Sequence, residues 1–153
     1  WEKIRSRLLA KIEEEKSPIK KGLAQAAVGT ALQVVALGDK GESPSLVLTL
    51  RHKLLDRLVL SKVRSGIGLD RCDIAVSTAA PGDPVVLSFF RALGLPMVEL
   101  YGMTENAAVA TSNFAGRMKL GTVGEPYPGI GLRIGPGLAA SRRSATRRRV
   151  ERV

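Results

Sequence analysis

The sequence has 153 residues, 44% of them hydrophobic, which is enough apolar material for one domain with a buried core. No apolar run reaches about 18 residues and no basic start precedes an apolar block, so neither a membrane span nor a secretory signal is expected. The net charge of +10 makes nucleic acid or an anionic membrane surface candidate partners, while a single cysteine and a single histidine exclude an internal disulfide and a structural zinc site.

The first half of the chain has the pattern of three helices. An amphipathic helix is expected over residues 1–16, where apolar residues recur every three or four positions. An Ala-rich, more buried helix is expected over 20–36, and the turn-rich composition of 38–44 predicts a loop. A third helix is expected over 46–64. Its predicted apolar face consists of Leu54, Leu55, Leu58 and Val59.

After residue 71 the pattern changes to short apolar runs separated by small residues. A buried strand is expected over 72–77, followed by a loop of small residues at 78–82. Asp83-Pro84 then has the composition of a helix start, with Asp as the N-cap and Pro at the first helical position, and Gly94 should end this helix. A second strand is expected over 96–100, the next loop is 101–105, and a short Ala-rich helix should follow.

This order of strand, loop, helix and strand predicts an α/β fold with a parallel sheet. In such sheets, ligands bind at the loops that follow the carboxyl ends of the strands. The loops at 78–82 and 101–105 both fall at that edge, so we expect them to lie near each other.

The last part of the chain changes character. A Gly-rich segment at 121–124 precedes residues 132–134, which are expected to begin another strand. Residues 135–153 contain six arginines against one glutamate and have no apolar periodicity. We therefore expect a domain over residues 1–134 and a disordered basic tail over 135–153.

Five consecutive residues, Tyr101-Gly102-Met103-Thr104-Glu105, resemble the AMP-binding motif of the adenylate-forming superfamily. The segments around them resemble the long-chain fatty-acid–CoA ligases (acyl-CoA synthetases) of that superfamily, in the same order and at similar spacing. The resemblance covers the central part of the family's large N-terminal domain, and it implies part of a parallel-sheet subdomain. The segments that carry it are 1–4, 56–64, 75–81 and 121–126.

The resemblance implies a two-step reaction. ATP and a fatty acid give an acyl-adenylate and pyrophosphate, and the thiol of coenzyme A then displaces AMP to give a thioester. By the same resemblance, Tyr101 would pack on adenine, Gly102 would let the backbone approach the nucleotide, and Thr104 would hydrogen-bond the α-phosphate. Glu105 would hold Mg²⁺, and it is expected to act in catalysis together with Thr104. The expected contacts to AMP or ATP are Ala79, Ala80, Pro81, Tyr101, Gly102, Met103 and Thr104.

The sequence departs from the family pattern in two ways. Thr78 and Ala79 stand where the family usually has glycine, which should tighten the loop around adenine. The 153 residues also hold no counterpart of the family's phosphate loop, of its ribose-binding aspartate, or of the C-terminal domain with its lysine. Because catalysis by positioning tolerates few missing groups, we expect a ligase fragment that is inactive alone. The remaining part of a split ligase is one candidate partner.

Other functions fit parts of the same sequence. A Tyr-Gly pair after a strand is common turn chemistry, and a Thr-Glu pair is a common helix start. One alternative is therefore a remnant without activity, and another is a binding module whose basic tail contacts nucleic acid or anionic lipid. The tail has no aromatic residue for base stacking, so no specific nucleic acid is expected. A lone thiol suits the cytoplasm, with peripheral contact at a membrane as the alternative location.

Overall fold

The computed structural model describes residues 1–106, 109–114 and 119–133. The chain divides into two compact units. The first consists of Trp1–Ala75 and Asp83–Met97, and the second of Val76–Gly82 and the chain from Val98 onward. The basic tail lies outside the described residues, so its disorder stays a prediction.

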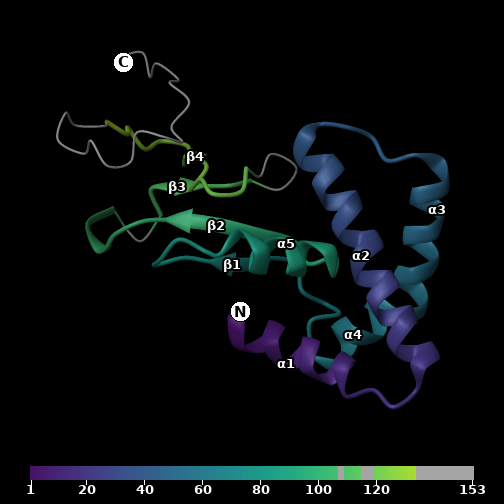
Figure 1. Cartoon of the computed structure of the whole chain (residues 1–153). Helices are drawn as coiled ribbons and strands as arrows, with labels where there is room; N and C mark the ends of the chain where they lie inside the picture. Colours follow the sequence, from purple (N-terminus) through teal and green to yellow (C-terminus); the bar gives the residue numbers. More distant parts are fainter. Residues whose placement is uncertain (107–108, 115–118, 134–153) are drawn as a thin grey trace. The chain divides into compact units, whose positions relative to one another are not determined.

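The first unit is mainly helical (Figure 1). Helix α2 packs against α1, α3, η1 and α5, and is therefore the central helix of the unit. No helix in the described part of the chain is both long and apolar enough to cross a membrane. The helices are α1 (Glu2–Glu13), α2 (Pro18–Lys40), α3 (Leu46–Leu55), the π-helical turn η1 (Asp56–Leu60), α4 (Ser61–Gly66) and α5 (Pro84–Ala92).

The core of this unit combines small side chains on α2 with large ones on α5. Ala27 and Ala31 are fully buried, which lets neighbouring helices approach α2 closely. Phe90 is also fully buried, and its ring centroid lies 4.9 Å from that of Trp1 and 5.3 Å from that of Phe89. These three rings form an aromatic cluster that holds the start of the chain against α5.

Helix α5 begins where the sequence predicts. The side chain of Asp83 accepts a hydrogen bond from the amide of Val85 (2.8 Å), and Pro84 is the first helical residue. The helix ends at Ala92, and Gly94 follows with a φ of 83°, a conformation that favours glycine. Both ends of α5 are thus set by local sequence.

The end of α2 differs from the prediction. The helix continues to Lys40 and is capped by Gly41, which has a left-handed φ of 76°. The predicted loop at 38–44 therefore begins three residues later than expected. Gly41, and not Gly38, provides the left-handed C-terminal cap, so Gly38 lies inside the helix.

The predicted apolar face of the third helix was confirmed at Leu55 and wrong at Leu54 and Leu58. Leu55 is buried, but Leu54 and Leu58 are 60% and 47% exposed. The chain makes a π-helical turn at 56–60, so Leu60, five residues after Leu55, is on the buried side. A purely α-helical period of 3.6 residues does not predict this change of face.

The second unit contains most of a four-stranded sheet with the order β1-β2-β3-β4. β2 pairs with β3, and β3 with β4, in antiparallel register. The order of strand, helix and strand over β1, α5 and β2 agrees with the predicted α/β class, but the prediction of a parallel sheet was wrong for β3 and β4. The strands are β1 (Ala75–Ser77), β2 (Met97–Tyr101), β3 (Thr111–Ser112) and β4 (Glu125–Pro126).

Two further expectations near the end of the described chain differ from the structure. A single 3₁₀ turn, η2 (Thr104–Asn106), begins within the loop expected at 101–105. Of the Ala-rich helix expected after that loop, residues 107–108 lie outside the described part, and residues 109–110 are not helical. Leu132 and Arg133 belong to no strand, and Ile134 is not described. The strand predicted at 132–134 is therefore not found at its first two residues.

Candidate functional site

The two small-residue loops follow neighbouring strands of the sheet (Figure 1). β1 leads into residues 78–82, β2 leads into 101–105, and both loops belong to the second unit. Val98 is buried and anchors β2, while the strand ends in front of Gly102. Loops at strand ends are the usual carriers of binding groups, because the sheet positions them rigidly.

A buried carboxylate joins the first loop to the second strand. Glu99, on β2, is 5% exposed, and its Oε1 accepts a hydrogen bond from the amide of Gly82 (3.3 Å). Its Oε2 is buried without a hydrogen-bond partner among the described residues. Burial raises the pKa of Glu99 above its ordinary value, and the hydrogen bond from Gly82 opposes this rise. The end of the first loop is thus held against β2, two residues before Tyr101.

The first loop contains a residue in a strained backbone conformation. Ala79 has a φ of 74°, and no other non-glycine residue in the described chain has a positive φ. This left-handed region costs an L-residue about 1–2 kcal/mol. The pattern that this loop resembles has glycine here, so Ala79 occupies a backbone shape suited to glycine.

The side chains expected to contact a nucleotide are accessible. Tyr101 and Met103 are 44% and 45% exposed, and Thr104 and Glu105 at the start of η2 are exposed as well. Gly102 is half-buried between them. The predicted site residues therefore lie on two loops of one unit, open to solvent. On the first loop, the expected contacts Ala79, Ala80 and Pro81 are exposed, as is Thr78.

Glu105 offers one carboxylate to a metal ion. Across residues 1–106, 109–114 and 119–133, no group of three or more His, Cys, Asp or Glu side chains could hold a metal. Mg²⁺ is commonly bound by one or two carboxylates together with phosphate oxygens and water. The exposed Glu105 therefore fits a Mg²⁺ ion that binds together with a nucleotide.

A buried asparagine fixes the Gly-rich segment at 121–124 beside β3. Asn113 is 2% exposed, and its side-chain amide donates a hydrogen bond to the carbonyl oxygen of Thr122. Gly124 has a φ of 83°, and a Cβ atom there would lie 2.0 Å from the carbonyl oxygen of Ser112. Only glycine fits this position, so the segment has a structural role next to the sheet.

Glu99 and Asn113 were not among the site residues predicted from the sequence. A signal for Glu99 was present, because an acidic residue within the apolar run at 96–100 must either be exposed or find a partner. Asn113 had no such signal, since its partner at Thr122 lies nine residues away on a segment without periodicity.

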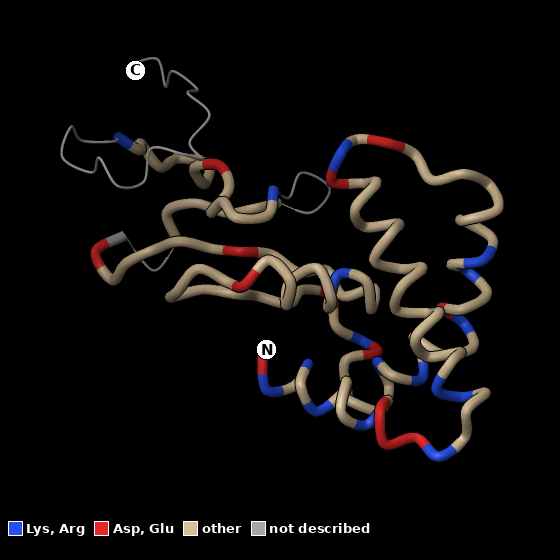
Figure 2. The backbone as a smooth tube through the Cα atoms, in the orientation of Figure 1, with Lys and Arg blue, Asp and Glu red and all other residues tan. Residues whose placement is uncertain are grey.

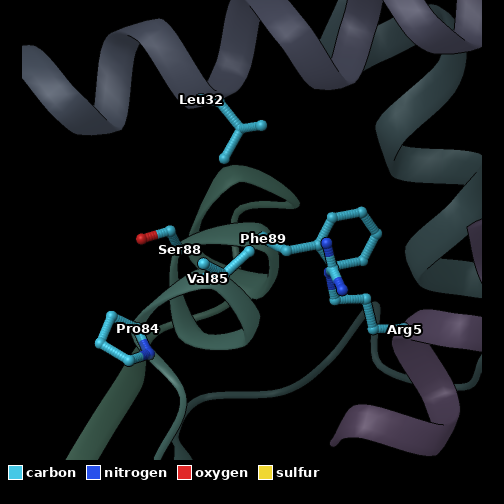
Figure 3. Close-up of a pocket in the computed structure, with 6 residues that line it drawn as sticks. All are labelled: Arg5, Leu32, Pro84, Val85, Ser88 and Phe89. Carbon is cyan, nitrogen blue, oxygen red and sulfur yellow. The ribbon is translucent and has the colours of Figure 1, made fainter.

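A separate cavity of about 280 Å³ lies in the first unit (Figure 3). The guanidinium carbon of Arg5 lies 5.7 Å from the ring centroid of Phe89, and the buried Arg5 Nε has no hydrogen-bond partner among the described residues. None of the predicted site residues lines this cavity, so it adds nothing to the two loops. The lining residues are Arg5, Leu32, Pro84, Val85, Ser88 and Phe89.

Comparison with known proteins gives a consistent set of relatives. A Mycobacterium tuberculosis protein, provisionally named fatty-acid–CoA ligase fadD11, is 34% identical over 130 residues, which cover 85% of this chain and 23% of the relative. The long-chain-fatty-acid–CoA ligase FadD15 of Mycobacterium bovis is 41% identical over 109 residues, or 71% of this chain and 18% of the relative. The long-chain-fatty-acid–CoA ligase ACSBG2 of Xenopus laevis is 31% identical over 134 residues, or 88% of this chain and 18% of the relative.

The chain spans about a fifth of the length of these curated relatives, from 18% to 23%. No family model matches the chain, and no solved structure matches it significantly. The bacterial and vertebrate relatives are all named as fatty-acid–CoA ligases, and this agreement supports the assignment of the chain to that family. This chain therefore belongs to the long-chain fatty-acid–CoA ligase family, and it corresponds to part of the length of the family members that it matches.

Proposed function

We propose that this chain carries half of the AMP-binding site of a fatty-acid–CoA ligase. The observation that supports the proposal most directly is the pairing of the two loops. They follow neighbouring strands, and Glu99 on the second strand holds Gly82 at the end of the first loop. A nucleotide that contacts both loops would therefore bind to two segments whose relative position is fixed by the neighbouring strands β1 and β2 and by the Glu99–Gly82 hydrogen bond.

The exposed residues have the chemistry that adenine requires. An aromatic face such as that of Tyr101 provides area and stacking for a planar base. Ala79, Ala80 and Pro81 carry little side chain, so a base can approach their backbone closely. Gly102 and Met103 would complete the contact through the main chain beside Tyr101.

The proposed reaction begins with attack of a fatty-acid carboxylate on the α-phosphorus of ATP, and pyrophosphate leaves. The thiol of coenzyme A then attacks the acyl carbon and displaces AMP. The Thr104 hydroxyl would hydrogen-bond an α-phosphate oxygen, and the Glu105 carboxylate would bind Mg²⁺. That ion supplies positive charge to the phosphate oxygens when it is bound.

The 153-residue chain alone is expected to be inactive in adenylation, because these residues provide positions for adenine and the α-phosphate only. Exchange of labelled pyrophosphate into ATP, with a fatty acid present, measures the first step. We expect no exchange above background. Robust exchange by the isolated chain would contradict the fragment assignment.

Binding of AMP to paired tyrosine variants tests the site itself. Tyr101 and Tyr127 are 44% and 46% exposed in the same unit, but only Tyr101 lies on the candidate loops. The change Tyr101→Leu should weaken AMP binding about tenfold, since stacking on a base is worth about 1–3 kcal/mol. Tyr127→Leu should leave binding nearly unchanged. Equal effects of the two changes would count against the site.

The arginines of 135–153 favour a second candidate function, a basic segment that binds polyanions. Such binding would weaken steeply with salt and would be lost on deletion of 136–153. Retention of salt-sensitive binding after the deletion would remove this alternative.

A further inference from the structure

The buried side chain of Asn113 bonds to both ends of one turn, residues 119–122. Its Nδ2 atom donates hydrogen bonds to the carbonyl oxygens of Thr122 and Lys119, the latter at 3.5 Å, and its Oδ1 atom accepts one from the amide of Lys119 at 3.3 Å. Asn113 is 2% exposed. Because buried polar groups are costly when they are unpaired, these bonds hold the turn in one position against the end of β3.

The chain leads from this turn to the base of the candidate nucleotide loop. β4 pairs with β3, and the amide of the next residue, Tyr127, donates a hydrogen bond to the carbonyl oxygen of Ala110 at 2.9 Å. The amide of Ala110 in turn donates to the carbonyl oxygen of Tyr101 at 2.7 Å. The candidate loop leaves the sheet after Tyr101, and the chain returns to it at Ala110, which is 1% exposed. This pair therefore closes the base of the loop, and Tyr127 holds the pair from one side.

Asn113 also lies opposite Glu99 in the sheet. The amide of Asn113 donates to the carbonyl oxygen of Glu99 at 2.9 Å, which continues the antiparallel register of β2 and β3. Directly opposite residues of an antiparallel pair place their side chains on the same face. Glu99 is the one charged residue within β1, β2 and β3 (Figure 2, where these strands are otherwise tan), and its side chain holds Gly82. One cross-strand pair therefore anchors two segments, with Glu99 holding the first loop and Asn113 holding the turn.

A buried asparagine can serve stability alone, or it can also set the position of a binding loop. Loss of the Asn113 side chain would leave the Lys119 amide and the Thr122 carbonyl oxygen without these partners, so the turn would move. β4 begins at Glu125, shortly after the turn, and its movement would reach Tyr101 through the hydrogen bonds at the base of the loop. A displacement of about 1 Å is enough to spoil a positioned contact such as that of an aromatic ring on adenine. The nucleotide loop therefore depends on a side chain that lies outside it.

We propose that Asn113 is a positioning residue for the AMP site. By fixing the turn at 119–122, it holds β4 and Ala110 in place, and these set the backbone of Tyr101 at the start of the loop 101–105. In this role Asn113 contacts no nucleotide atom and acts through the backbone. The inference rests on the proposed function of the two loops, and it adds to them a residue from a third strand.

Titration of the full chain with AMP and Mg²⁺, followed through the amide NMR signals of residues 101–105, tests the proposal. At one AMP concentration below the Kd, the shifts of Asn113→Ala should be about a tenth of those of the parent, because a binding position populated about one part in ten lowers the apparent affinity tenfold. Arg64→Met is the control for a general loss of stability, since it removes the hydrogen bonds of Arg64 to Asp56 and Leu93 in the first unit. Its folded molecules should bind AMP as the parent does.

Hydrogen exchange of the chain without nucleotide gives a second readout. In Asn113→Ala the amides of Ala110 and Tyr127 should exchange about tenfold faster than in the parent, since local opening sets their exchange. Asn113→Asp serves where Asn113→Ala does not fold, because it keeps the volume and the acceptor for the Lys119 amide and loses, when ionised, the donor to the Thr122 carbonyl oxygen. Asn113→Asp should weaken AMP binding as well. A role in stability alone would lower the urea midpoint of these variants and leave the AMP shifts of their folded molecules at parental values.

Two results would overturn the positioning role while leaving the nucleotide site in place. One is parental AMP shifts in the folded Asn113 variants, measured beside a parent that binds AMP. The other is an equal loss of AMP binding in Arg64→Met, because the effect would then come from stability in general. A parent without any AMP shifts would instead contradict the nucleotide site itself, and the positioning role would fail with it.

Discussion

The Oε1 atom of Glu99 lies 3.3 Å from the amide nitrogen of Gly82, and this hydrogen bond crosses from β2 to the end of the loop that follows β1. Glu99 is 5% exposed and its second oxygen has no partner among the described residues. A carboxylate buried in this way is costly when it is ionised. The contact therefore links the position of the loop to the protonation of one side chain.

A first prediction concerns the pH dependence of stability. Because burial raises the pKa of Glu99 in the folded state, its contribution to stability is fully present below the ordinary glutamate pKa of 4.5 and is lost as the pH rises through the folded-state pKa. Glu99→Gln is neutral at every pH and can still accept the Gly82 hydrogen bond. Its free energy of unfolding, relative to the parent, should rise with pH over this window. Urea unfolding of both proteins across the window measures it, and a constant difference would contradict the account.

A second prediction concerns the strained residue of the first loop. Ala79→Gly should stabilise the chain by about 0.5–1 kcal/mol, because relief of the left-handed penalty exceeds the entropy cost of glycine. Ala80→Gly is the control, since Ala80 has no positive φ, and it should destabilise by a few tenths of a kcal/mol or more. Urea midpoints of the two variants should move in opposite directions. A shift of both in the same direction would rule out strain at Ala79.

A third prediction compares two reasons why glycine is needed at a position: a left-handed backbone conformation, and a lack of space for a Cβ atom. Gly121 and Gly124 have φ values of 75° and 83°, but only at Gly124 would a Cβ strike backbone, at Ser112. Gly121→Ala should cost about 1–2 kcal/mol from conformation alone. Gly124→Ala should cost clearly more, because the pairing of β3 with β4 must open. Thermal unfolding compares the two, and equal losses would show that this pairing is absent in solution.

A fourth prediction concerns a charged contact in the first unit. Arg64 Nη1 donates hydrogen bonds to Asp56 Oδ1 and to the carbonyl oxygen of Leu93, both at 2.6 Å. Arg64→Met keeps the aliphatic stem and should destabilise by about 2 kcal/mol, since it leaves that half-buried carboxylate and carbonyl unpaired.

Arg91→Met is the control for this contact. Arg91 pairs with Asp39 at 2.7 Å, and its side chain is 19% exposed, against 18% for Arg64. Among the described residues, the Arg91 guanidinium donates to the Asp39 carboxylate and to no backbone carbonyl, so the loss should be nearer 1 kcal/mol. Chemical denaturation of both variants gives the comparison, and a larger loss for Arg91→Met would contradict it.

The helices could be predicted where local signals decide them. Asp83 and Pro84 fix the start of α5, and the spacing of apolar residues fixes α1. The face of α3 could not be predicted, because the π turn that buries Leu60 depends on packing against α2. Strands β3 and β4 have two residues each, which is too short for a period of two to appear.

The candidate site was predictable only in part. The order of strand and loop placed 78–82 and 101–105 on adjacent strands, and the structure agrees. The hydrogen bond between Glu99 and Gly82 was not predictable, because it joins residues 17 positions apart. The left-handed φ of Ala79 was not predictable from the residue type either, since alanine rarely adopts it.

Amide NMR of the labelled chain during titration with AMP and Mg²⁺ will show whether the loops at 78–82 and 101–105 form half of an AMP site. A half site should bind weakly, with a Kd on the order of 1 mM, which this method detects. We expect the largest shifts at Ala79, Ala80, Gly82 and from Tyr101 to Glu105, and much smaller shifts at Tyr127. Shifts confined to other residues, or none at saturating nucleotide, would contradict the claim.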